Sequence, residues 1–325
     1  MDRARIEAAL AGAYPGLPDS AAGGRPVYRG KVRDVVEGTG RLLLVASDRI
    51  SAFDRVLSTI PFKGEVLTRV SAWWFARTSD IVPNHLVSPS ELGGRDPVAE
   101  TGRACLVRRA DMVPVEVVVR GFLTGSAWRD YQAGRPVSGI VLPSGLALDS
   151  EFPEPLLTPS TKEASGHDRP ASGEELVRSG RVDADLWEEI SRAARALYLR
   201  GREIAREHGL VLVDTKYEFG VAEGRLVLAD EIHTPDSSRY RRLAGPGASA
   251  PGTRSELDKE SFRRWLAERG FTGDGEPPAI TDEIRIETAA RYVEAFEAVT
   301  GEIFEPNPRS TQALDDLLAE WTLAV

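Results

Sequence analysis

One segment of the sequence, LVDTKYEFG, places a charged residue at every second position. These residues are Asp214, Lys216 and Glu218, and they follow an apolar run that is typical of a strand. Side chains of a strand alternate between its two faces, so the three charges would share one face. A second apolar run ends at Asp230. A hairpin between the two runs brings Asp230 onto the face of Glu218 if the numbers of paired residues sum to an even value.

Two carboxylates and a lysine on one face suit the chemistry of phosphate transfer. The carboxylates of Glu218 and Asp230 could bind Mg²⁺, which takes few protein ligands and leaves positions for phosphate and water. The ammonium group of Lys216 could neutralise a phosphate during its transfer. The same spacing also fits a solvated hairpin face with ion pairs across the strands, and spacing alone leaves both interpretations open.

A glycine turn with a lysine lies near the N-terminus, in the segment YRGKVRDVV. Gly30 and Lys31 separate two strand-like runs, and the backbone N–H groups of such a turn can bind nucleotide phosphates. The segment does not fit the P-loop pattern, because Val32 stands where that pattern needs Ser or Thr. A strand–loop–strand phosphate clamp, as in the glycine-rich loops of kinases, fits better, and a plain hairpin turn is the alternative.

Two other segments pair an arginine with hydroxyl groups, a combination that binds anions. In VEVVVRGFLTGSAW, Arg120 precedes Ser126 at a predicted helix N-terminus, where backbone amides also attract anions. Helix capping is the alternative there. In HTPDSSRY, Ser238 and Arg239 suit a sugar phosphate, with an Asx turn as the alternative. His233 in the same segment has no metal-like spacing to the other histidines, so we expect it to have a structural role.

A mixed set of strands and helices must position these residues. The patterns predict an antiparallel meander over 26–47, a helix over 64–80, strands over 104–109 and 115–121, a long helix over 183–209, a hairpin over 210–233, and two closing helices over 258–270 and 281–301. Residues 133–160 contain five prolines and predict an ordered loop or linker. Two polar segments, SDRISAFDRVL and TPSTKEASGHD, predict loops that could close over a ligand. Early strands and late helices indicate an α+β fold.

Composition excludes several classes of protein. The 325 residues carry a formal net charge of −9, which argues against binding to duplex nucleic acid. No apolar segment is long enough to cross a membrane, and the N-terminus does not resemble a signal peptide. The single cysteine cannot form a disulfide within the chain, which suits a reducing compartment. We therefore expect a cytoplasmic protein that binds small molecules.

Together, these segments closely resemble the phosphoribosylaminoimidazole-succinocarboxamide synthase (SAICAR synthetase) family. The most characteristic stretches of that family match MVPVEVVVRGFLTGS and LVDTKYEFG here. Further matches run the length of the chain: GKVRDVV, SDRISAFD, IPFKGEVLTRVSAWWF, VPNHLV, EPLLTPSTKEASGHD, DEIHTPDSSRY and DKESFRRWL. The sequence departs from the family pattern at Arg241, where tryptophan is common, and at residues 244–253, which are rich in Gly, Ala and Pro.

The resemblance implies a fold and a reaction. The fold would be α+β and distantly kinase- or ATP-grasp-like, with an N-terminal antiparallel β-rich lobe over 1–113, a larger C-terminal α/β lobe over 114–325 and an ATP cleft between them. The protein would join L-aspartate to carboxyaminoimidazole ribonucleotide, with ATP and Mg²⁺, giving the succinocarboxamide, ADP and phosphate in purine biosynthesis. The route would be phosphorylation of the imidazole carboxylate, followed by attack of the aspartate amine on the acyl phosphate. The protein would be a monomer or a small homo-oligomer.

The resemblance also implies roles for individual residues in binding each ligand. The ATP phosphates would contact Gly30, Lys31 and Arg33. A turn at Met112 would hold adenine through its backbone, and Glu116 would bind the ribose. Glu218 and Asp230 would bind Mg²⁺, and Lys216 would contact the transferring phosphate or the substrate carboxylate. The ribonucleotide would contact Arg120, Ser126, Ser238, Arg239 and Arg263, and Asp54 would face this substrate or aspartate.

Two other functions would use some of the same features. A kinase would also have a glycine loop and strand-borne metal ligands, but the sequence lacks the H-R-D-x-x-x-x-N and D-F-G signatures of protein kinases. A nucleotide sensor without catalytic activity would not need both acids together with Lys216. Replacement of Glu218 by Gln would separate these possibilities, because only an enzyme would lose turnover.

Overall fold

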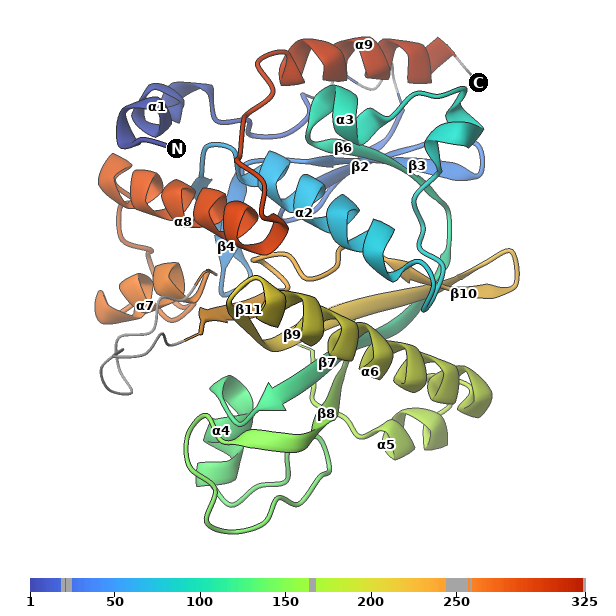
Figure 1. Ribbon diagram of the computed structural model, residues 1–325, viewed down its shortest axis with the longest axis vertical. Helices are drawn as coiled ribbons and strands as arrows, with labels where there is room; N and C mark the ends of the chain where they lie inside the picture. The colour runs from blue at the N-terminus through green and yellow to red at the C-terminus, as the bar shows by residue number, and fades with distance from the viewer. Residues whose placement is uncertain (19–20, 22–24, 164–167, 244–256, 258, 324–325) are drawn as a thin grey trace.

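The computed structural model describes residues 1–18, 21, 25–163, 168–243, 257 and 259–323. Two antiparallel sheets and a short hairpin are surrounded by helices (Figure 1). The α+β class predicted from the sequence is confirmed. No helix in the described part of the chain is both long and apolar enough to span a membrane.

The N-terminal sheet is the predicted meander with one further strand. Its order is β1-β2-β3-β6, and every neighbouring pair is antiparallel. The strands are β1 (Val27–Arg29), β2 (Arg33–Glu37), β3 (Arg41–Ala46) and β6 (Ala104–Arg108). Gly30 occupies the turn between β1 and β2, where its N–H donates to the carbonyl of Arg33 at 2.8 Å. The predicted glycine turn therefore connects the edge strand β1 to its neighbour β2.

The second sheet carries the charged face. Its order is β10-β9-β7-β8, and β11 also pairs with β9. The strands are β7 (Asp111–Phe122), β8 (Glu151–Thr161), β9 (Leu210–Ala222), β10 (Arg225–Ala229) and β11 (Ser238–Arg242). The long helix α6 (Ala184–Glu207) lies along β9 (Figure 1). Its apolar stripe packs in the main core with the uncharged face of the strand, leaving the charged face for a site.

The proline-rich segment is partly a strand, so the predicted loop over 133–160 is wrong beyond residue 150. Residues 151–161 form β8, which pairs with β7 along one edge of the sheet. Proline has no N–H to donate, so a strand that contains several prolines is tolerated at a sheet edge. The prolines led the sequence prediction to a loop, but the outer edge of this strand needs few backbone hydrogen-bond donors.

The register of the predicted hairpin also differs from expectation. Glu218 pairs with Ala229, so the paired numbers sum to an odd value and a regular strand would direct Asp230 to the opposite face. Asp230 lies just beyond the end of β10 and has φ of 59°, in the left-handed region. This turn takes the chain out of the strand geometry, and it brings the Asp230 carboxylate close enough to influence Lys216 and Glu218 electrostatically.

Helices complete the core around both sheets. The predicted helices correspond to α2 (Lys63–Thr78), α6, α7 (Glu260–Glu268) and α8 (Asp282–Thr300), and α8 begins at the predicted Thr281 cap. The sequence prediction missed α9 (Ser310–Leu323), which packs on α3 (Pro97–Thr101). The remaining helical segments are α1 (Arg3–Ala8), η1 (Leu10–Gly12), η2 (Pro89–Leu92), α4 (Gly125–Gln132) and α5 (Gly173–Arg178).

The division into two lobes at residues 113 and 114 stays a prediction. That point lies inside β7, and α8 and α9 pack against helices that precede it in the chain. One large hydrophobic core includes residues from both sides of the predicted boundary.

Candidate active site

Three charged side chains meet on the face shared by β7 and β9. Lys216 donates to Glu116 and to Glu218 through its Nζ atom, at 2.7 Å in each case. Glu116 pairs with Glu218 across the two strands, which places both carboxylates on the same face as the lysine. The alternation seen in the sequence thus produces a compact cluster of one cation and two anions.

Arg33 binds two carboxylates of the segment that follows β10. Its Nη1 atom donates to Asp230 at 2.8 Å, and its Nη2 atom donates to Glu231 at 2.6 Å. Arg33 lies on β2 in the N-terminal sheet, so the contact links the two sheets. Glu231 was not predicted as a site residue. Its only signal in the sequence is that it adjoins Asp230.

Burial and neighbouring charges shift the pKa values of Glu218, Lys216 and Asp230. Burial raises the pKa of Glu218, but Lys216 and Lys162 outweigh that effect and lower it to about 2. Burial lowers the pKa of Lys216, but Glu218 and Glu116 outweigh it and hold the pKa above its ordinary value. Burial, together with the charges of Glu231 and Glu218, raises the pKa of Asp230 above its ordinary value despite Arg33. A divalent cation would relieve the repulsion between these carboxylates.

Lys162 is a contact residue that the sequence did not single out. It lies just after β8, and its ammonium group forms an ion pair with Glu218. Its own side chain is 46% exposed. The segment TPSTKEASGHD indicated a polar loop but not the direction of this lysine. Of that loop, residues 164–167 lie outside the described part of the chain.

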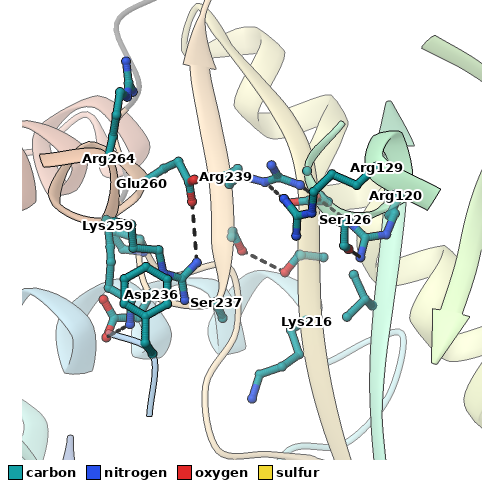
Figure 2. Close-up of a pocket in the computed structure, with 18 of the residues that line it drawn as sticks. Arg120, Ser126, Arg129, Lys216, Asp236, Ser237, Arg239, Lys259, Glu260 and Arg264 are labelled. Atoms are coloured by element: carbon teal, nitrogen blue, oxygen red, sulfur yellow. Dashed lines mark hydrogen bonds and ion pairs between the residues drawn. The ribbon is translucent and has the colours of Figure 1, made fainter. Parts of the chain in front are cut away.

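A pocket of about 720 Å³ opens beside the cluster and is lined in part by Lys216. All six residues predicted for the substrate side line it: Asp54, Arg120, Ser126, Ser238, Arg239 and Arg263. Figure 2 shows Arg120, Ser126 and Arg129 on one side of the pocket and Lys259, Glu260 and Arg264 on the other. The pocket therefore presents cations on two opposing walls.

Asp214 fixes the arginines on one wall. It accepts from Arg239 Nε at 2.9 Å and from Arg120 Nη1 at 3.2 Å. Arg120 also donates to Ser126 at 3.0 Å and to Thr158 at 2.9 Å, so its guanidinium plane is held on three sides. Burial raises the pKa of Asp214, but Arg239 and Arg120 outweigh it and lower the pKa below its ordinary value. The alternating pattern contained Asp214, but nothing in it indicated this positioning role.

The remaining predicted residues lie in two other places. Lys31 is exposed and forms an ion pair with Asp54. Asp54 is in the turn between β4 (Arg49–Ala52) and β5 (Arg55–Thr59), so the loop predicted from SDRISAFDRVL is a hairpin. Met112 is part of β7 and not of a separate turn, although the register with β9 shifts between Met112 and Glu116.

His233 lies in the core, as expected from the sequence. Its Nε2 atom is hydrogen-bonded to the hydroxyl of Tyr217, and its ring packs edge-on against Trp74. Burial lowers the pKa of both His233 and His85 to about 3.

These two histidines predict a pH-dependent loss of stability. Their pKa is about 3 in the folded protein and roughly 6.5 in the unfolded chain. Below that higher value the unfolded chain binds protons that the folded protein does not, so stability falls as the pH falls. We expect the free energy of unfolding to drop by about 2.5 kcal/mol between pH 7 and 5.5. Urea unfolding at both pH values measures this, and His85→Asn should halve the drop. An unchanged midpoint would contradict the prediction.

The donor set of the cluster fits a magnesium ion. Mg²⁺ is commonly bound by one or two carboxylates plus phosphates and water, and Glu218 and Asp230 would supply two carboxylates. Among the residues described here, no group of three or more His, Cys, Asp or Glu side chains is arranged to hold a metal ion.

Known proteins share the sequence over most of this chain. The SAICAR synthetase family profile matches residues 26–278. The phosphoribosylaminoimidazole-succinocarboxamide synthase of Saccharopolyspora erythraea is 49% identical over 285 residues, covering 85% of this chain and 93% of that protein. The protein of the same name from Legionella pneumophila (strain Lens) is 43% identical over 292 residues, covering 86% and 90%.

Solved structures share the fold as well. The SAICAR synthase of Saccharomyces cerevisiae, complexed with SAICAR, has a TM-score of 0.75 and 35% identity, covering 89% of this chain and 98% of that one. A SAICAR synthetase in complex with ADP has a TM-score of 0.65 and 25% identity, covering 86% and 100%. With a matching profile, relatives above 40% identity and a common fold, the chain belongs to the SAICAR synthetase family.

Proposed function

We propose that the protein is an ATP-dependent ligase of purine biosynthesis. It joins the amine of L-aspartate to the carboxylate of carboxyaminoimidazole ribonucleotide, giving the succinocarboxamide, ADP and phosphate. Family membership supports this reaction, as do the relatives described as binding SAICAR and ADP. The observation that carries the proposal is that Lys216 belongs both to the carboxylate cluster and to the cationic pocket.

The chemistry requires activation of a poor acyl donor. A carboxylate oxygen is a poor leaving group, and its conversion to an acyl phosphate makes the carbonyl carbon open to attack by an amine. The γ-phosphate and the substrate carboxylate must therefore meet, and catalysis is mainly positioning and charge neutralisation. Lys216 lies where the two ligands would meet, and its ammonium group would neutralise charge on the transferring phosphate.

The other residues have roles that follow from their places. Arg33, with Gly30 and Lys31 on the neighbouring turn, would bind the phosphates of ATP, while Met112 and Glu116 on β7 would bind its adenine and ribose. Glu218 and Asp230 would hold Mg²⁺, which neutralises phosphate charge when bound. Arg120, Ser126, Ser238, Arg239 and Arg263 would bind the ribonucleotide, and Asp54 would lie at the substrate or aspartate side.

The location and assembly of the enzyme follow as expectations. Its three substrates are small charged metabolites, and we expect the reaction to take place in the cytoplasm. We expect a monomer or a small homo-oligomer.

The decisive experiment measures ADP release by the purified protein with Mg-ATP and carboxyaminoimidazole ribonucleotide, with and without L-aspartate. We expect release that depends on aspartate and equals the amount of succinocarboxamide formed. Release that is indifferent to aspartate would indicate a kinase instead. Binding of ATP without any release would indicate a nucleotide sensor, and either result would overturn the ligase.

A further inference from the structure

A lysine is fully buried outside the pocket described above. Lys63 is the first residue of α2, and its side chain is 0% exposed. It does not line the pocket. Burial of an ammonium group is costly unless the charge is paired, so its partner indicates why it is there.

The partner of Lys63 is a carboxylate of the pocket wall. Lys63 Nζ donates to Asp236 at 2.8 Å, and the second carboxylate oxygen accepts from the hydroxyl of Tyr292 on α8. Lys259 approaches the same carboxylate at 3.5 Å. Burial raises the pKa of Asp236, but Lys259 and Lys63 outweigh it, and the pKa stays below its ordinary value. The carboxylate is therefore charged and is held by groups from α2 and α8 and by the N-cap residue of α7.

The position of Lys63 is unfavourable by local criteria. A cation at a helix N-terminus is opposed by the helix dipole. The preceding residue, Phe62, has φ of 69°, a left-handed conformation that non-glycine residues adopt at a cost. Such local costs persist where the surrounding structure requires the arrangement, often at functional sites. The ion pair with Asp236 is the contact that accounts for them.

Asp236 belongs to a tight turn that delivers substrate-side groups to the pocket. Its N–H donates to Thr234 Oγ1 at 3.2 Å, and Ser238 N–H donates to the Thr234 carbonyl at 2.9 Å. The Ser237 carbonyl accepts from Lys216 N–H at 2.9 Å. Asp236, Ser237, Ser238 and the next residue, Arg239, all line the pocket. Figure 2 labels Asp236, Ser237 and Arg239 among the side chains drawn there. A shift of Asp236 would therefore move the hydroxyl groups and the guanidinium that follow it.

We propose that Lys63 is a positioning residue for the phosphorylated substrate, an inference that builds on the proposed function. Its ammonium group holds Asp236 from behind the pocket wall and so fixes the 234–239 turn. It also competes with Lys259 for the carboxylate. With Lys63 in place, Lys259, which lines the pocket, keeps part of its charge available for an anionic ligand.

The test compares Lys63→Met with Val70→Ala, a control in the buried face of the same helix. Calorimetry measures the Kd of carboxyaminoimidazole ribonucleotide and, in parallel, of ribose 5-phosphate, while kinetics give the KM of ATP. We expect K63M to weaken both phosphorylated ligands at least tenfold and to leave the KM of ATP within twofold. V70A should lower the Tm without changing the Kd of either phosphorylated ligand or the KM of ATP. Tyr292→Phe, a milder change at the same carboxylate, should weaken the ribonucleotide about threefold if K63M does not fold.

A double-mutant cycle asks whether Lys63 acts through Asp236. The combination of K63M with Asp236→Asn should bind the ribonucleotide no more weakly than D236N alone, because the partner is already gone. Additive losses would overturn the proposal, as would binding by K63M within twofold of the unmodified protein. Failure of the unmodified protein to bind ribose 5-phosphate would also overturn it. If ribose 5-phosphate binds but no aspartate-dependent turnover occurs, the proposed function fails, and the ribose 5-phosphate comparison still decides the role of Lys63.

Discussion

Replacement of Glu218 by Gln is expected to lower kcat/KM at least about 1,000-fold, a loss typical of removing a charge that stabilises a transition state. Glu218 lies between Lys216 and Lys162, and its pKa of about 2 makes it fully ionised at neutral pH. The amide would keep the shape of the side chain but would not bind Mg²⁺ as a carboxylate does. Lys216 would keep its contact with Glu116, so folding should be close to normal. Turnover and thermal unfolding, measured together, check this.

Glu223→Gln is the matched control for this prediction. It is the same chemical change in the turn of the same hairpin, where the Glu223 side chain is 73% exposed. We expect its activity to be within twofold of the unmodified protein. If E218Q keeps more than a tenth of the activity, Glu218 is not a metal ligand. Restoration of activity by higher Mg²⁺ would instead show weakened metal binding and support the assignment.

Replacement of Arg120 by Met is expected to raise the KM of the ribonucleotide about 100-fold, because a charge-assisted contact to phosphate contributes about 2 to 3 kcal/mol. Three contacts hold the guanidinium of Arg120 in place on the pocket wall, including that to Ser126. The KM of ATP should change little, since Arg120 lies on the wall of the substrate pocket. Initial rates with each substrate varied in turn measure both constants.

Arg135→Met provides the control for the loss of positive charge. Arg135 pairs with Asp130 at the protein surface and does not line the pocket. Removal of its charge should leave both KM values unchanged. Equal increases in the KM of ATP and of the ribonucleotide in R120M would be inconsistent with a phosphate contact and would indicate general disturbance of the sheet.

Strand periodicity predicted which charged side chains lie together. Asp214, Lys216 and Glu218 share a face because they lie on one strand, and the residues assigned to the substrate side line a common pocket. Their roles in catalysis stay predictions. The hairpin register expected for Asp230 was wrong, although its carboxylate lies close enough to influence Lys216 and Glu218. The hairpin register would have turned it away, and only its left-handed backbone returns it, a feature that residue spacing cannot reveal.

The contacts that the sequence missed connect segments far apart in the chain. Lys162 and Glu218 are 56 residues apart, and Lys63 and Asp236 are 173 residues apart. Such pairs depend on how sheets and helices pack, which local periodicity does not encode. β8 was missed because its prolines are read as loop residues unless the strand is known to lie at an edge.

Strands β10 and β11 share one edge of β9, and the segment 230–237 between them leaves the sheet and returns to it. Because both ends of this excursion are fixed to the same strand, its number of residues determines which side chains of β11 face the pocket. Insertion or deletion of a single residue would turn Arg239 toward the opposite side of the sheet. A single substitution in this segment changes one group of the site, whereas a change in its length would displace several groups of the pocket wall together.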